Sequence, residues 1–170
     1  MVERLWGGKL PEFESLDQAS ELMTVLVMNL WNRLTRHQER SSPFRLTLLE
    51  TDATRAGLAA TALVRRQEID GFIEGLFGPN ESLNLPERVH RGFNELGAIR
   101  AHFAAVVELA TDTTKPGTQS GMKTTARLIR EMTKFAEHEI HAVVLSCARA
   151  RRQLVESMPT KKPTKHRNSR

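Results

Sequence analysis

The chain has one cysteine, two tryptophans and no tyrosine among its 170 residues. The single thiol, Cys147, has no partner for an intramolecular disulfide and cannot complete a zinc site built on paired thiolates. No apolar run approaches the ~18 residues that a membrane helix requires, and residues 1–10 lack a signal-peptide core. We therefore predict a cytoplasmic protein without membrane segments, long enough to fold around a core without crosslinks.

The net charge of +5 is concentrated at one end of the chain. Residues 149–170 hold eight basic residues and one acid, a net +7, which leaves −2 for residues 1–148. This distribution excludes a basic face over the whole protein and indicates a cationic C-terminal segment.

Four segments carry apolar residues at helical spacing. The first begins at Ser15, which together with Gln18 has the pattern of a capping box, and continues to about Glu39. The other predicted helices run from Thr51 or Asp52 to Leu76, from Asn84 to Val107 and from Met122 to Leu154. In the second of these helices, we expect three glycines to mark close packing: Gly57, Gly71 and Gly75.

The connections between these helices show no second strand that could form a sheet. Residues 44–49 alternate apolar and polar side chains, but without a pairing strand we expect an extended connector. Residues 111–121 are rich in threonine and glycine, which predicts a surface loop. The sequence thus predicts an all-α protein, a single domain over residues 1–157 forming an antiparallel bundle of about four helices, followed by a disordered basic tail over residues 158–170.

The densest group of potential metal ligands lies in the fourth predicted helix. Glu137 and His141 share one helical face at i, i+4 spacing, and Glu87 with His90 forms a Glu-x-x-His pair in the third helix. Dimetal helical bundles use two such pairs and two further glutamates, so this set is incomplete. A solvated polar face with ordinary ion pairs is the competing interpretation.

The basic residues near the C-terminus form a candidate nucleic-acid site. Their guanidinium and ammonium groups would attract phosphates without sequence preference, but base stacking is excluded because this segment has no aromatic residue. A solubilising tail is the alternative. The candidates are Arg149, Arg151, Arg152, Lys161, Lys162, Lys165 and Arg167.

Three aromatic residues near the N-terminus, Trp6, Phe13 and Trp31, are candidates for binding a partner protein. They are equally compatible with a role as core or loop anchors. A shared exposed position would favour partner binding, because large exposed apolar patches mark interaction sites.

The run Leu5-Trp6-Gly7-Gly8, the segment 11–19 and the Leu30-Trp31-Asn32 step give the N-terminal part a family resemblance. Over roughly residues 5–45 the chain resembles the YecA/YgfB-like family of small bacterial helical proteins. This resemblance implies helices and a bacterial origin. It implies no chemistry, because the cysteine-rich zinc motif of some relatives is replaced here by lysine and arginine.

Together these patterns favour a non-enzymatic protein-interaction or adaptor module, whose partner is another protein or a second copy of the chain. No complete catalytic set is present in the sequence, and we expect no cofactor. A nucleic-acid-associated protein that uses the basic C-terminal segment is the alternative. A metal-dependent helical-bundle enzyme centred on Glu87, His90, Glu137 and His141 is a third possibility.

Overall fold

The chain divides into two compact units, Met1–Ser42 and Pro43–Arg170, where we expected a single domain over residues 1–157. The computed structural model describes residues 12–26, 28, 32–77, 85–114 and 117–158. All regular structure within these ranges is helical. The predicted all-α class is confirmed.

The first unit contains two short helices in its described part, α2 (Leu16–Val25) and α3 (Asn32–Arg36). The predicted cap of α2 is confirmed, because the Ser15 hydroxyl accepts the Gln18 N–H at 3.2 Å. Gln18 in turn accepts the backbone N–H of Glu14 at 3.0 Å. Helical structure ends at Arg36 and turns follow to Ser42, so this region is shorter than the predicted helix to Glu39.

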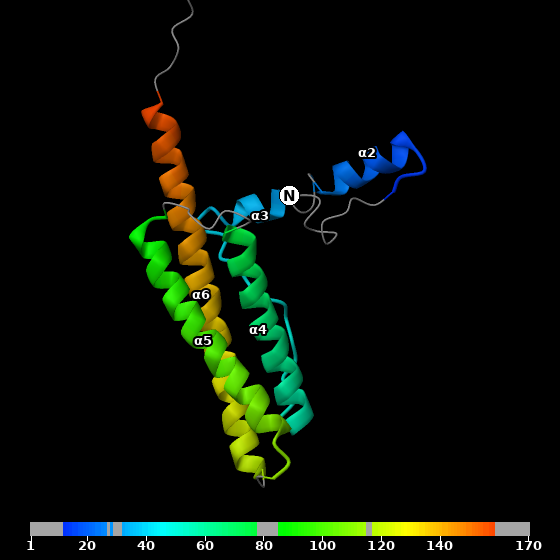
Figure 1. Ribbon diagram of the computed structural model, residues 1–170, viewed down its shortest axis with the longest axis vertical. Coiled ribbons are helices and arrows are strands. Elements are labelled where there is room, and N and C mark those ends of the chain that lie inside the picture. Colours follow the sequence, from blue (N-terminus) through cyan, green and yellow to red (C-terminus); the bar gives the residue numbers. More distant parts are fainter. Residues whose placement is uncertain (1–11, 27, 29–31, 78–84, 115–116, 159–170) are drawn as a thin grey trace, which may run out of the picture. The chain divides into compact units, whose positions relative to one another are not determined.

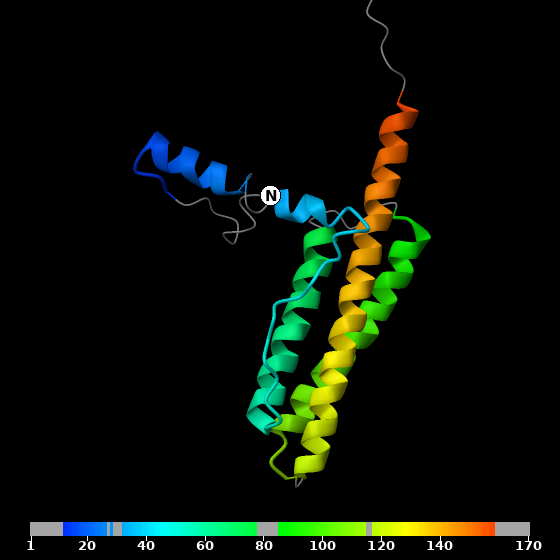
Figure 2. The ribbon, with the colours of Figure 1, turned by 180° about the vertical axis from the view of Figure 1, so that it is seen from behind.

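The second unit is a bundle of three long helices, α4 (Arg55–Phe77), α5 (Glu87–Thr111) and α6 (Gln119–Ser157), each packed on the other two. They run up, down and up, so that α4 and α6 are parallel and α5 is antiparallel to both (Figures 1 and 2). The bundle prediction is confirmed, with three packed helices in place of about four.

Side-chain caps fix two of the three helix starts. The Thr54 hydroxyl, rather than Thr51 or Asp52 as predicted, accepts the Gly57 N–H at 3.0 Å before α4. The Thr118 hydroxyl accepts the Gly121 N–H at 3.1 Å, so α6 begins earlier than predicted. Pro86 is the N-cap residue of α5, a position that tolerates its missing N–H, while the predicted start at Asn84 lies outside the described residues.

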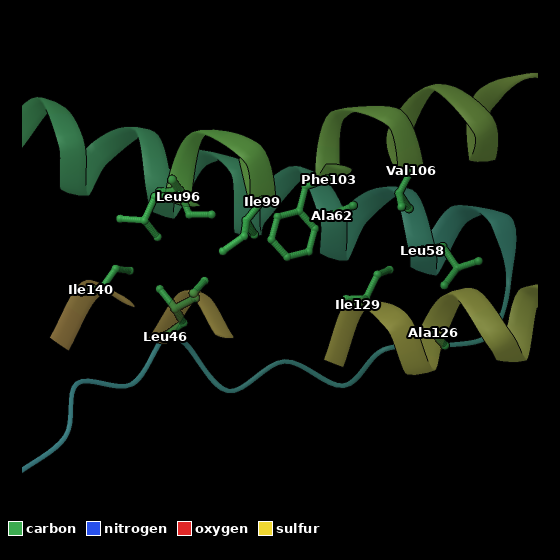
Figure 3. Close-up of a cluster of buried hydrophobic side chains, with 12 residues drawn as sticks. Leu46, Leu58, Ala62, Leu96, Ile99, Phe103, Val106, Ala126, Ile129 and Ile140 are labelled. Carbon is green, nitrogen blue, oxygen red and sulfur yellow. The ribbon is translucent and has the colours of Figure 1, made fainter. Parts of the chain in front are cut away.

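The apolar stripes of the three helices meet in one buried core (Figure 3). Its largest fully buried side chains come from every helix: Ile69, Val89, Leu96, Phe103, Ile129, Ile140 and Val143. This packing explains why the helices form, because an isolated amphipathic helix is marginal in water until its apolar face is covered.

A strap, defined here as residues 43–50, completes this core. It is extended, as predicted for residues 44–49, and runs alongside α4 in both ribbon views. Leu46 is 8% exposed and points from the strap into the helical core, whereas Leu48 is 96% exposed. The strap therefore contributes one deeply buried apolar side chain to the bundle.

Helix α6 is the longest element, 39 residues, or about 58 Å at roughly 1.5 Å per residue. Its last turns continue past the ends of α4 and α5 (Figure 1). Leu154 and Val155 are exposed there, and burial on α6 stops at Ala148. Within the described ranges, neither α6 nor any other helix has the length and apolarity to cross a bilayer.

The expected close packing at glycines holds at only one of the three predicted positions. A Cβ at Gly57 would lie 2.8 Å from the Asp52 carbonyl oxygen, in the turn that enters α4. Gly71 and Gly75 have no such neighbour within 4 Å, so the prediction is wrong for them. The tightest helix contact is instead at Gly92 of α5, where an added Cβ would overlap Cγ2 of Val143 on α6.

We predict that Gly92→Ala lowers the free energy of unfolding by up to about 2 kcal/mol. Overpacking against Val143 costs about 1–3 kcal/mol, against a helix-propensity gain of about 1 kcal/mol. The matched control is Gly97→Ala on the same helix, which meets nothing within 4 Å and should raise stability by up to about 1 kcal/mol. Urea unfolding of both variants measures the difference, and equal shifts would contradict the close contact.

Candidate interaction site

The four metal-ligand candidates do not converge. Among the residues that the structure describes, no three His, Cys, Asp or Glu side chains are gathered as a metal site. Glu87 is almost fully exposed and lies 3.5 Å from Arg91, while Glu137 is buried and is bound by residues of the strap. The arrangement needed for a metal-dependent enzyme is therefore not supported by the positions of Glu87, His90, Glu137 and His141.

Cys147 lies half-buried on the apolar side of α6. Burial raises the pKa of its thiol above the ordinary value, because removal from water penalises the thiolate. This environment is typical of a small packing residue and not of an activated nucleophile.

Three of the seven basic candidates, Arg149, Arg151 and Arg152, lie exposed in the last turns of α6. The other four, Lys161, Lys162, Lys165 and Arg167, lie outside the described residues. Along the visible end of α6 the three arginines are accompanied by one acid, Glu156. This end of the helix is thus cationic and projects beyond the bundle of the second unit.

The structure describes one of the three aromatic residues that are candidates for partner binding. Phe13 is exposed just before α2, whereas Trp6 and Trp31 lie outside the described residues. The structure therefore does not test whether the three aromatic side chains share one surface.

The first unit displays large apolar side chains at its surface. No residue of α2 is buried, and Leu16 at its start is 89% exposed. The larger exposed apolar residues in this unit are Phe13, Leu16, Met23, Val25, Met28 and Leu34. Monomeric proteins rarely keep such a series in water unless it serves an interaction.

The polar side chains around α2 are uniformly acidic or neutral. Residues 12–28 contain four acids and no lysine or arginine, and all four acids are exposed. An amphipathic helix of this kind can insert its apolar face into a groove of another protein. Its negative potential would favour the approach of a positively charged surface.

In the second unit, two ionised side chains of α4 hold the backbone of the strap. The Thr47 N–H donates to Oε1 of Glu68 at 2.9 Å, and Nη2 of Arg65 donates to the Thr47 carbonyl at 2.7 Å. Arg65 and Glu68 also pair with each other at 2.5 Å, one helical turn apart. Both the backbone N–H and the backbone carbonyl of Thr47 are thereby hydrogen-bonded to α4.

Helix α6 holds the neighbouring residues through Glu137. Its Oε1 accepts the Leu46 N–H at 3.1 Å, and its Oε2 accepts Nη1 of Arg45 at 2.6 Å. Glu137 is 9% exposed, so its charge depends on these partners in place of water. We call the surface formed by Arg65, Glu68 and Glu137 the strap site.

A second buried carboxylate, Glu139, joins α6 to α5. It accepts Nη2 of Arg88 at 2.8 Å beside the tight contact at Gly92. Between α4 and α5, Asp70 binds Arg100 and raises the pKa of its guanidinium, through the hydrogen bond first and the charge second. Ionised side chains thus join α5 to both α4 and α6, and the strap to both α4 and α6.

Sequence reasoning missed the strap site. It treated Glu137 as part of a solvated face or as a metal ligand, whereas Glu137 and its neighbour Glu139 are both buried and bound to arginines. The spacing of Arg65 and Glu68 is an available signal, but it predicts only an ordinary helix ion pair, since their shared target is 18 residues or more away in sequence.

Comparison of the chain with protein-family models, with curated proteins and with solved structures found no significant match. The function must therefore be inferred from the geometry and chemistry of its own residues.

We predict that Glu137→Ala lowers the free energy of unfolding by about 1–3 kcal/mol, because it leaves the buried N–H of Leu46 without its acceptor. Glu131→Ala is the matched control on the same helix, since Glu131 is exposed and pairs with Lys134. That control should change stability by less than about 0.5 kcal/mol. Similar losses for both variants in urea unfolding would argue against a buried role for Glu137.

Proposed function

We propose that this chain is a non-enzymatic protein-interaction module that binds another protein through helix α2. The observation that carries the proposal is that no residue of α2 is buried, although its sequence is amphipathic, and that Leu16, Met23 and Val25 are exposed. Covering each large apolar side chain contributes about 1.5–3 kcal/mol, so a few of them supply a useful binding energy.

The chemistry of α2 favours a particular kind of partner. Met23 and Met28 are exposed, and methionine side chains adapt to irregular apolar surfaces. The exposed acids Asp17 and Glu21 favour a partner whose groove carries lysine or arginine. The proposed mechanism is insertion of one helical face into an apolar groove on a basic partner protein.

The second unit supports a scaffold role in this proposal. Its buried ionised side chains, Arg65, Glu137 and Glu139, are each engaged by a neighbouring charge or backbone group. Such groups orient the elements of the bundle relative to one another. Their engagement favours a structural role for them over a reaction at this place.

We further propose a cytoplasmic location and membership of the YecA/YgfB-like family. Several of the residues that carry the family resemblance, among them Trp6, Gly7, Gly8 and Trp31, lie outside the described residues. The Ser15 cap at the start of α2 agrees with the helix that the resemblance implies after the Trp-Gly-Gly turn.

For the proposed binding helix, we predict that Leu16→Asp combined with Met23→Asp reduces partner binding at least tenfold, because two apolar contacts become charged. The control is Leu109→Asp, an exposed leucine on α5 of the second unit, which should leave binding unchanged. Partners captured from lysate of the source organism are purified, and their affinity for the three chains is measured by calorimetry.

Equal affinities of the wild type and the double variant would reject α2 as the binding element. Light scattering of the isolated chain separates self-association from capture of another protein. A dimer that the double variant abolishes would identify a second copy as the partner.

A second candidate function is binding of nucleic acid by the C-terminal segment. The observation that favours it is the exposure of Arg149, Arg151 and Arg152 on a helix end that projects from the bundle. Such a projecting cationic helix could contact phosphates, and the lysines and arginines that follow it in sequence would add to the attraction.

On this second hypothesis, we predict that Arg149→Ala, Arg151→Ala and Arg152→Ala together weaken DNA and RNA binding and reduce the salt dependence of the affinity by up to about three phosphate contacts. The matched control changes Arg127 and Arg130, exposed arginines in the first half of α6. Fluorescence anisotropy at several salt concentrations measures both. No binding by any chain, or an unchanged salt slope, would remove this candidate.

A further inference from the structure

The strap is recognised mainly through its backbone. Three of its main-chain groups are bound by side chains of the strap site: the N–H of Leu46, the N–H of Thr47 and the carbonyl of Thr47. Backbone contacts of this kind select an extended conformation and depend little on which side chains the bound segment carries. The strap site therefore has the recognition chemistry of a binding site for extended peptides.

Side-chain selectivity in this site rests on one position. Leu46 enters the core, Phe44 packs partly against it, and Leu48 points into solvent. Arg45 adds a charged contact to Glu137, although its own side chain is largely exposed. The preferred ligand is thus an extended segment with an apolar residue that follows a basic one.

The strap site is also suited to opening. Its walls are the ionised side chains of Arg65, Glu68 and Glu137, all of which regain water when the strap leaves. Burying ion pairs carries a desolvation cost that largely cancels their attraction, so their release opposes opening only weakly. Within the described residues, Nε of Arg65 is buried without a hydrogen-bond partner while the strap is in place.

We propose that the strap site is a peptide-binding site that accepts the strap of a second copy of this chain, so that two copies exchange straps. The second copy is the occupant that fits best, because its segment 43–48 reproduces each contact described above. Residues 49–54, which comprise the end of the strap and the turn before α4, have no regular structure and can extend to about 20 Å. This inference does not depend on the proposed role of α2.

In the exchanged pair, each strap site makes the same contacts as before, but the strap that fills it comes from the other copy. In a symmetric pair both strap sites are filled, both Leu46 side chains are buried, and Glu137 keeps its partners. The opposing terms are the entropy of association and the rearrangement of the turn at Asp52, which packs closely on Gly57. The exchanged form should therefore grow with protein concentration.

The first experiment titrates a fluorescent peptide with the sequence of residues 42–50 into full-length chains. Leu46→Asp should displace the chain's own strap, and this variant should bind the peptide at least tenfold more tightly than the wild type. Leu48→Asp is the matched control, since Leu48 points into solvent, and it should behave as the wild type. A peptide that carries aspartate in place of Leu46 should bind at least tenfold more weakly.

The second experiment mixes two chains with complementary defects. Leu46→Asp retains an intact strap site, and Glu137→Lys retains an intact strap but repels Arg45. Light scattering after chromatography should show a 1:1 heterodimer in the mixture and monomers in each separate sample. Monomers alone in the mixture would overturn exchange, as would a folded Leu46→Asp chain that binds neither peptide or binds both equally.

Hydrogen exchange of the unmodified chain provides a test that no folding defect can obscure. The amides of Leu46 and Thr47 should exchange at least tenfold faster than the amide of Ile69 in α4, because the strap opens without unfolding the bundle. Equal rates would mean that the strap leaves only when the whole unit unfolds, and the proposal would be wrong.

Discussion

The position of the strap in the second unit depends on the hydrogen bonding of one buried carboxylate, Glu137. With 9% exposure it cannot rely on water, so it requires the N–H of Leu46 and the guanidinium of Arg45. These two contacts place an extended segment against α6, and that placement brings Leu46 into the core. A charged group thereby determines where an apolar side chain is buried, and the irregular strap becomes part of the bundle.

The periodic features of the sequence predicted most of the fold because helices and their core faces follow directly from spacing. The stripes of α4, α5 and α6 appear in the structure, and Ser15 caps α2 as its pattern with Gln18 indicates. The ends were less accurate, since Thr54 and Thr118 compete with nearby residues of equal capping ability. The number of packed helices was also overestimated, because an amphipathic stripe predicts a helix but does not identify the surface that covers it.

The candidate sites could not be predicted to the same extent, because they depend on contacts between residues distant in sequence. Glu137 contacts Leu46 across 91 positions, and Glu139 contacts Arg88 across 51. Local charge pattern assigns such glutamates to a solvated face. The need for glycine at position 92 could not be predicted either, because it arises from the approach of Val143 on another helix.

The two units differ in how completely their apolar and charged side chains are covered by residues of the same unit. This difference indicates which side chains are available for an interaction. In the bundle, apolar stripes are buried and the internal charges of Arg65, Glu137 and Glu139 are bound, so its interior has little to gain from a partner. In the first unit, Leu16 and its apolar neighbours remain in water. Part of the hydrophobic free energy still to be gained therefore lies on α2. The strap joins the two, and it is held by contacts that another extended peptide of the same pattern could make equally well.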